Sequence, residues 1–254
     1  MIIIKTPDEI DLMRRADRIV AEVLETLREN VKPGLTTADL EKMAEEGLER
    51  NGAQSAFKGY PGPRGPFPSV LCASINDEVV HGIPSKERVL EEGDIVSLDF
   101  GSIWHGYYGD AAITVGVGKV SEEAEKLMRV TEESLMKAVE RVREGNRLNE
   151  IGRAVQSHVE SRGFSVVRQF VGHGIGSEMH EDPQIPNFEE RSAPKPRLKQ
   201  GMVLAVEPMV NQGHWAVKVL EDGWTAVTQD GSLSAHFEHS IAVGPDGPEV
   251  LSKI

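Results

Sequence analysis

The 254-residue chain has very little cysteine and no long apolar run. Its single cysteine, Cys72, excludes an intrachain disulfide framework and any cysteine-rich zinc or iron–sulfur site. No stretch approaches eighteen consecutive apolar residues, and the N-terminal MIIIKTPDEI lacks the apolar core of a signal peptide. We therefore expect a cytoplasmic protein without a membrane span.

Basic residues are also scarce relative to acidic ones. The chain has 28 Lys and Arg against 41 Asp and Glu, which gives a net charge of −13. This is the wrong sign for a protein whose main partner is a phosphate backbone or an anionic membrane surface, so no DNA and no membrane partner is expected. Most of the acidic excess is typical of solubility, which leaves open whether some carboxylates carry chemistry.

Apolar spacing divides the chain into helical and strand-like stretches. The expected helices begin at Pro7, at Thr36 or Thr37, at Ser121 (with Gly145 as its end) and at Leu148 (ending at Ser161). β-Branched runs broken by glycine predict strands in residues 70–117, from about residue 164, and, after a proline-rich pause over residues 183–196, in residues 202–210 and 237–244. This order, without a low-complexity linker, indicates a single α+β domain over residues 1–254.

Two short patterns occur twice, in the same order. The segment LEEGDIVSLD (90–99) resembles LKQGMVLAVE (198–207), and both end on a carboxylate. The segment DAAITV (110–115) resembles EHSIAV (238–243), and both begin with one. Either likeness alone could arise by chance between apolar strands. Two in the same order, each with an acid at the matching position, predict a duplicated fold.

A duplicated fold would have pseudo-repeat halves of about residues 7–118 and 119–245. A pseudo-twofold axis between them would bring four carboxylates to one central point: Asp99, Asp110, Glu207 and Glu238. Each lies in or beside an apolar run, where a carboxylate is costly unless it is paired, protonated or bound to a cation. A buried hydrogen-bonded carboxylate would explain any one of them equally well, but four converging acids favour divalent metal binding.

Three histidines lie beside turn glycines, where the imidazole is free to point into a cavity. They are His81 in VVHGIP, His173 in GHGIG and His180, seven residues later. A lone histidine at a strand end is usually structural, and that interpretation is kept for His105, His158, His214, His236 and His239. Carboxylates and imidazoles without thiolates suit Mn(II), Fe(II), Co(II) or Zn(II), and two such ions match the two-metal hydrolase pattern.

Four motifs resemble those of the type I, bacterial-like methionine aminopeptidases: S-I-N-D-E-V-V-H-G-I-P, a D-x₁₀-D pair, G-H-G-I-G-x-x-x-H, and V-E-P with a later F-E-H. The resemblance runs over essentially the whole chain. It implies a pita-bread fold, in which helices cover an antiparallel-rich curved sheet with pseudo-twofold internal symmetry. It also implies a metalloprotease of protein maturation, a hydrolase that removes the N-terminal initiator methionine from nascent proteins when the second residue is small.

The same resemblance implies two divalent metal ions per chain, with Co, Mn, Fe and Zn all possible. Asp110 and Glu238 would bridge the two ions, and Asp99 would bind one of them. His173 and Glu207 would complete the other. One monovalent cation is further expected near Asn76 and Ser234.

Three residues would be catalytic. Glu207 would act as the general base for the bridging water, and the resulting metal-activated hydroxide would attack the peptide carbonyl. His81 and His180 would contact the substrate, donating hydrogen bonds to the scissile amide and the developing oxyanion.

A methionine pocket would be lined by Phe57, Tyr60, Cys72, Met179 and Trp224. Residues 59–68, GYPGPRGPFP, form a loop between Tyr60 and Cys72 that must shape one wall of this pocket. We name this segment the Pro/Gly loop. The implied partners are N-terminal methionyl peptides and nascent chains, with transient ribosome association, and a monomer is expected.

Two other functions compete with this one. A peptidase of the same fold that cleaves X-Pro bonds would resemble the chain around the ligands. Such enzymes usually carry an additional N-terminal domain. A non-catalytic homologue that binds protein or RNA is the second alternative, and the intact ligands and the acidic charge argue against it.

Overall fold

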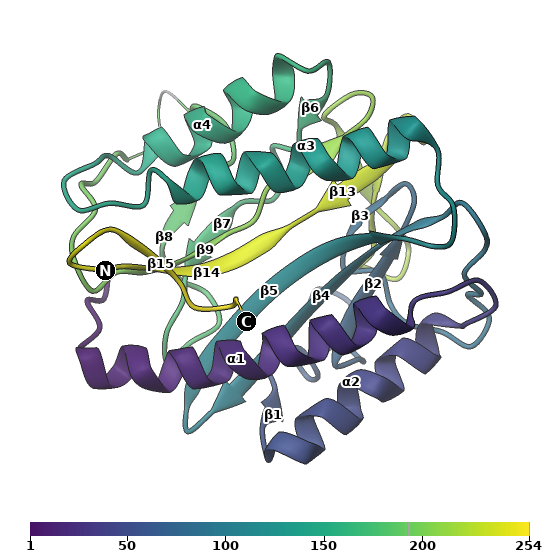
Figure 1. The fold of residues 1–254 in the computed structure, drawn as a ribbon, viewed down its shortest axis with the longest axis horizontal. Coiled ribbons are helices and arrows are strands. Elements are labelled where there is room, and N and C mark those ends of the chain that lie inside the picture. The colour runs from purple at the N-terminus through teal and green to yellow at the C-terminus, as the bar shows by residue number, and fades with distance from the viewer. Residues whose placement is uncertain (191, 193, 254) are drawn as a thin grey trace.

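Four helices lie on the same side of a curved sheet in the part of the chain that the computed structural model describes, residues 1–190, 192 and 194–253 (Figure 1). They are α1 (Pro7–Asn30), α2 (Thr37–Asn51), α3 (Glu122–Val139) and α4 (Asn149–Glu160). The expected order of helices, strands, helices and strands is confirmed.

The helices begin at or next to the predicted residues. Thr36 at the start of α2 and Ser121 at the start of α3 each accept a hydrogen bond from a backbone N–H of the first helical turn. Thr6 does the same for α1, where Pro7 is the first helical residue. The fourth helix begins at Asn149 without a side-chain cap.

The end of α3 differs from the prediction, which placed it at Gly145. The helix stops at Val139, and the backbone N–H groups of Arg141 and Val142 then bond to carbonyls three residues earlier. This tighter turn keeps the Val142 side chain fully buried. Apolar spacing cannot distinguish such a turn from continued α-helix, because both place Val142 against the core.

The strands form one large sheet and two small ones. The first half of the chain supplies β1 (Gln54–Ser55), β2 (Leu71–Ile75), β3 (Glu78–Val80), β4 (Ile95–Trp104) and β5 (Tyr107–Gly116). The second half supplies β6 (Ser165–Val166), β7 (Gly172–Gly174), β8 (Glu181–Ile185), β9 (Val203–Val206), β10 (Met209–Asn211), β11 (Val217–Val219), β12 (Ala226–Thr228), β13 (Ser234–His236), β14 (Glu238–Val243) and β15 (Pro248–Val250). The large sheet runs β1-β4-β5-β14-β9-β7-β8, with β2 paired to β4 and β15 to β14, and its pairings are antiparallel.

The centre of this sheet is symmetric with respect to the repeated sequence patterns. The four strands at this centre lie in the order β4-β5-β14-β9. The two inner strands, β5 and β14, contain the repeated segments 110–115 and 238–243. The two outer strands, β4 and β9, overlap the repeated segments 90–99 and 198–207, each of which ends on an acid. Helices α1 and α2 share a hydrophobic core with first-half strands, whereas α3 and α4 share another mainly with second-half strands. Both observations support the proposed halves of residues 7–118 and 119–245.

The proline-rich segment contains a strand where a pause was expected from residue 183. Strand β8 includes Pro183 and runs to Ile185. This strand is the last in the order of the large sheet. Proline is tolerated there because one side of an edge strand makes no inter-strand hydrogen bonds, so an N–H group is not needed on that side. Positions 191 and 193 of the same segment lie outside the described residues.

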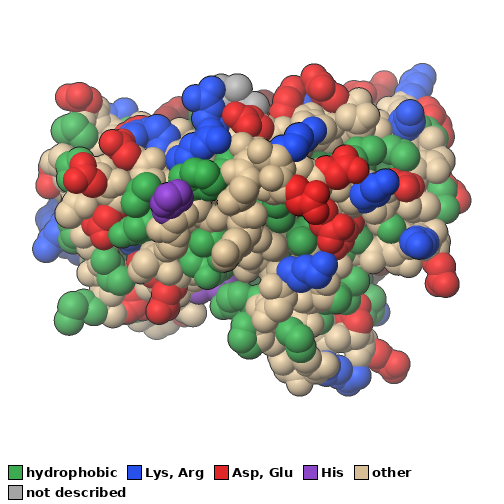
Figure 2. All heavy atoms as spheres, turned by 90° about the horizontal axis from the view of Figure 1, so that it is seen from below, with side chains coloured by type: hydrophobic (Ala, Val, Ile, Leu, Met, Phe, Trp, Pro, Cys, Tyr) green, Lys and Arg blue, Asp and Glu red, His purple; other side chains and the backbone are tan. Residues whose placement is uncertain are grey.

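The surface carries charges of both signs. Figure 2 shows acidic and basic side chains interspersed over the face seen from below, with hydrophobic side chains between them. In the described part of the chain, no helix combines the length and apolar character needed to cross a membrane.

Helix α1 lies directly against β5 at Gly109. A Cβ atom added there would lie 2.5 Å from the backbone nitrogen of Asp17, closer than such atoms can approach. In Gly109→Ala we expect α1 to be pushed off the sheet, with a loss of about 1–3 kcal/mol in the free energy of unfolding, measured by urea denaturation.

Gly116→Ala in the same strand is the matched control. Its Cβ would lie 2.8 Å from a methyl carbon of Val120, the end of a side chain that can move. We expect a smaller loss there, and equal losses in the two variants would contradict close backbone packing of α1 on β5.

Candidate metal centre and active site

Three acids are brought onto one face of the sheet by strand register. Asp99 on β4 pairs with Ala112 on β5, and Ala112 also pairs with Glu238 on β14. Paired residues on neighbouring strands point to the same face, as do residues two apart on one strand. Asp110, two residues before Ala112, therefore shares this face with Asp99 and Glu238.

The second half adds the other two predicted ligands to the same face. The pairing of β9 with β14 places Glu207, the residue after β9, level with Glu238. His173 on β7 pairs with Ala205, two residues before Glu207. The five side chains thus converge because adjacent strands carry them in register.

Short distances confirm this convergence. One ligand atom from each of Asp110, His173 and Glu238 lies within 4.8 Å of the other two. The His173 Nε2 atom lies 3.6 Å from Glu207 Oε1 and 3.9 Å from Asp110 Oδ2. His173 Nδ1 lies 2.9 Å from the carbonyl oxygen of Gly174, which accepts a hydrogen bond from the Nδ1–H group. Nε2 is then the unprotonated nitrogen, free to bind a cation.

The buried carboxylates are incompletely satisfied by the protein alone. One oxygen each of Asp99, Asp110 and Glu238 is buried without a hydrogen-bond partner among the described residues. Burial raises the pKa of Asp99 to about 7. Burial and neighbouring carboxylates, Asp99 first, raise the pKa values of Asp110 and Glu207 well above the ordinary range, and burial with the charge of Asp110 does so for Glu238. Such a donor set fits a divalent cation, which would supply the missing partner.

The two other predicted histidines lie at the rim of this centre. His180, in the loop between β7 and β8, places Nδ1 2.7 Å from the Tyr60 hydroxyl and its ring 4.3 Å from that of His173. His81 follows β3 with a positive φ of 62°, and its ring meets Trp224 edge to face. Burial and the nearby His180 lower the pKa of His81 to about 4. Burial also lowers the pKa of His180. Both imidazoles can therefore offer a hydrogen bond as neutral groups at pH 7.

A cavity of about 140 Å³ connects these groups with an apolar pocket. It is lined by every residue predicted as a divalent-metal, catalytic or methionine-pocket residue: Phe57, Tyr60, Cys72, His81, Asp99, Asp110, His173, Met179, His180, Glu207, Trp224 and Glu238. The remaining lining residue is Phe67, which the sequence did not single out. Cys72 reaches the cavity because β2 pairs it directly with Asp99.

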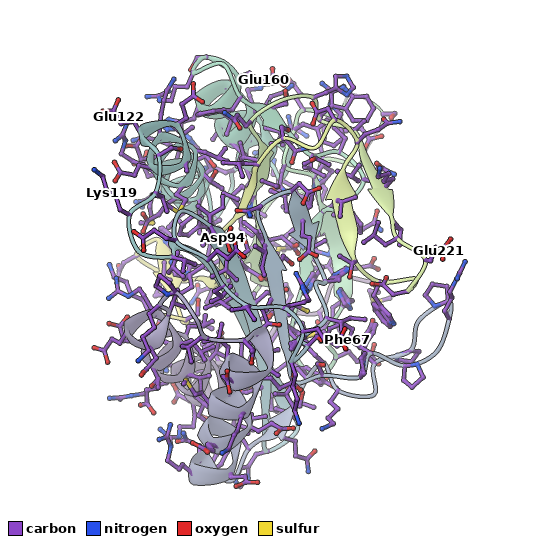
Figure 3. All side chains as sticks on the ribbon, turned by 90° about the vertical axis from the view of Figure 1, so that its right-hand side faces the viewer. Phe67, Asp94, Lys119, Glu122, Glu160 and Glu221 are labelled. Atoms are coloured by element: carbon purple, nitrogen blue, oxygen red, sulfur yellow. The ribbon has the colours of Figure 1, made fainter. Side chains whose placement is uncertain are left out.

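Phe67 comes from the Pro/Gly loop, whose base is closed by backbone hydrogen bonds. Gly59 N–H donates to the Phe67 carbonyl, and Phe67 N–H donates to the Tyr60 carbonyl, both at 2.8 Å. The Phe67 ring packs edge to face on Trp224, with 5.1 Å between centroids. In Figure 3, Phe67 and Glu221 lie on the side of the sheet away from the helix that begins at Glu122. The cavity therefore opens on the face opposite the helices.

Two more residues beside the carboxylates were missed from the sequence. His236 is almost fully buried, and its Nε2 atom lies 3.9 Å from Glu207 Oε2. Asp17 on α1 accepts a hydrogen bond at 3.1 Å from the backbone N–H of Asp110. An acid within the apolar stripe of α1 was the available signal for Asp17. His236 lies two residues before Glu238 and shows no comparable signal.

The residues expected near a monovalent cation lie together. The Ser234 N–H donates to the Asn76 carbonyl at 2.8 Å, and the Asn76 side chain donates to Asp94. The cation itself stays a prediction.

Comparison with known proteins places the chain in a family. The profile of metallopeptidase family M24 matches residues 11–245. Methionine aminopeptidase of Clostridium perfringens is 53% identical over the whole of both chains, and methionine aminopeptidase 1 of Bacillus subtilis is 50% identical over the same extent. The crystal structure of methionine aminopeptidase from Thermotoga maritima, 48% identical, superposes over all of both chains with a TM-score of 0.96. The expected α+β pita-bread fold is thereby confirmed, and the chain belongs to the methionine aminopeptidases of metallopeptidase family M24.

Proposed function

We propose that this chain is a metal-dependent aminopeptidase that removes N-terminal methionine from peptides and nascent proteins when the second residue is small. One observation carries the proposal: five ligand-type side chains on one sheet face share a cavity of about 140 Å³ with an apolar pocket. A hydrolytic centre and a binding site for one apolar side chain are thus adjacent.

The five side chains would hold the metal. The unpartnered buried oxygens and the free Nε2 of His173 fit this role, and oxygen with imidazole ligands suits Mn, Fe, Co or Zn. We propose that two ions would be held together by Asp99, Asp110, His173, Glu207 and Glu238. When bound, the ions would polarise the scissile carbonyl and make water a better nucleophile at neutral pH.

The chain's own residues would then move protons and hold the substrate. Glu207 would accept a proton from the attacking water at a carboxylate oxygen. His81 and His180 would donate hydrogen bonds to the scissile amide and to the oxygen that gains charge in the transition state. Phe67 and Trp224, packed on each other, would hold the methionine side chain in the apolar part of the cavity.

The remaining expectations from the sequence stay predictions. They are a monovalent cation at Asn76 and Ser234, transient ribosome association, a monomeric state and a cytoplasmic location.

Turnover of two peptide classes tests the proposed function. Metal-free protein reloaded with Mn(II), Fe(II), Co(II) or Zn(II) should release methionine from Met-Ala-Ser and should leave Ala-Pro peptides intact. Amino-acid release by chromatography measures both. No methionine release with any metal would rule out the function, and faster X-Pro cleavage would favour the alternative peptidase.

Glu207→Gln should lose most of its turnover. The substitution removes a ligand charge and the proton acceptor together, and loss of a general base alone lowers rate by about 10²–10⁴-fold. Steady-state kcat on Met-Ala-Ser with saturating metal is the measurement. Glu249→Gln, at an exposed carboxylate of β15, is the matched control and should keep normal kcat. Near-normal kcat in Glu207→Gln would contradict the assigned role.

The metal-free protein should become less stable as the pH rises above about 7.5. Asp99, with its pKa raised to about 7, and the other three acids hold protons in the folded state after the unfolded chain has lost them. Buried histidines act in the opposite direction, because a lowered pKa such as that of His173, about 3, stabilises the fold as the unfolded chain loses its proton. That gain is largely complete about one pH unit above the ordinary histidine pKa of about 6.5, so the acids dominate the pH dependence above about pH 7.5.

Urea denaturation at about pH 7.5 and about pH 8.5 measures this dependence. The free energy of unfolding of the metal-free protein should be lower at the higher pH. Added Mn(II) should raise stability more at the higher pH, because binding requires deprotonated carboxylates. Metal-free stability that rises over this interval would show that the four acids are already ionised.

A further inference from the structure

A lysine near the N-terminus forms a buried ion pair beside the active site. Lys5 Nζ contacts Glu181 Oε2, and each side chain is only 3% exposed. Charges this buried are costly unless each has its partner, and removal of one partner leaves the other charge buried and unpaired. The Lys5 backbone N–H is itself held by the Gly201 carbonyl at 2.8 Å.

The second oxygen of Glu181 holds the loop that carries His180. Glu181 Oε1 accepts hydrogen bonds from the backbone N–H groups of Ser177 at 3.0 Å and Glu178 at 3.4 Å. One carboxylate thus joins the N-terminal segment to the turn between β7 and β8. The next two residues of this turn are Met179 and His180, which both line the cavity.

The backbone at Gly176 packs closely against both side chains of the ion pair. A Cβ atom added at Gly176 would lie 2.4 Å from Lys5 Cε and 2.5 Å from Glu181 Oε1. The Gly176 carbonyl accepts from the backbone N–H of Tyr108, at the start of β5, at 2.9 Å. The loop is therefore fixed on one side by strand β5 and on the other by the ion pair.

Among the described residues, the His180 side chain has one hydrogen bond, between its Nδ1 and the Tyr60 hydroxyl. That hydroxyl belongs to Tyr60, the second residue of the Pro/Gly loop. The placement of the ring relative to the carboxylates depends on the backbone of residues 176–181, and so on Glu181.

We infer that Lys5 is a positioning residue for catalysis, which holds His180 through Glu181 at the distance that the reaction requires. This inference rests on the proposed aminopeptidase function. Lys5 is not among the residues that line the active-site cavity, and it acts by holding the Glu181 carboxylate in place. A misplacement of a catalytic group by about 1 Å can cost about 10²-fold in rate.

Lys5→Met tests the inference, because methionine keeps most of the side-chain volume and removes the charge. We expect kcat on Met-Ala-Ser to fall by between about 10-fold and about 100-fold with KM little changed. The double variant Lys5→Met/Glu181→Gln should recover most of this loss, since glutamine is neutral and its oxygen can still accept from Ser177 and Glu178. Arg14→Met is the matched control: it breaks an exposed pair between α1 and Glu249 and should leave kcat unchanged.

The ¹⁵N spectrum of the His180 ring, assigned by comparison with His180→Ala, gives a readout that does not need turnover. In Lys5→Met the His180 signals should shift and those of His158, on distant α4, should not. A Lys5→Met variant with unchanged kcat and unchanged His180 signals would overturn the inference, even if it melts at a lower temperature. A double variant as slow as the single one would overturn it too. Failure of the wild-type protein to release methionine would instead refute the proposed function, and the His180 signals would still decide the positioning role.

Discussion

The structure depends on holding four mutually repelling carboxylates on one face of a sheet. They are held by main-chain register: Ala112 on the central strand pairs with both Asp99 and Glu238, so their side chains cannot separate without breaking the ladder. Asp17 on α1 adds a further restraint by accepting from the Asp110 N–H. The helices on the other face bury the strands that carry the acids. A cation that offsets the repulsion is then bound by a site built mostly before it arrives.

The repeated sequence patterns account for the symmetry of this arrangement. Each half contributes one acid from an inner strand and one from an outer strand or its end, and the two inner strands, β5 and β14, pair at the centre. The histidine ligand breaks the symmetry. His173 on β7 stands next to β9, whereas the first-half strand next to β4, β2, places Cys72 beside Asp99. One side of the centre therefore has an imidazole and the other an apolar wall.

The sequence predicted which acids converge better than it predicted the residues around them, for a physical reason. An acid inside an apolar strand is costly wherever the strand lies, so Asp99, Asp110 and Glu238 were visible without knowledge of the fold. Phe67 could not be identified in this way, because its burial depends on contact with Trp224, a residue distant from it in the sequence. The end of α3 was missed for another reason: a tighter turn and a continued α-helix both bury Val142, so the apolar spacing cannot distinguish them.

The pocket and the metal centre are built from different kinds of structure. The ligands come from strands, or from the residue next to one, and their spacing is set by the sheet. The apolar walls come largely from loops: Phe67 from the Pro/Gly loop, Met179 from the turn before β8, and Trp224 from the connection between β11 and β12. Loops tolerate changes of length that strands in register do not. Substrate preference can therefore change through these segments while the five ligands stay in place, provided that the loop before β8 keeps His180 aligned.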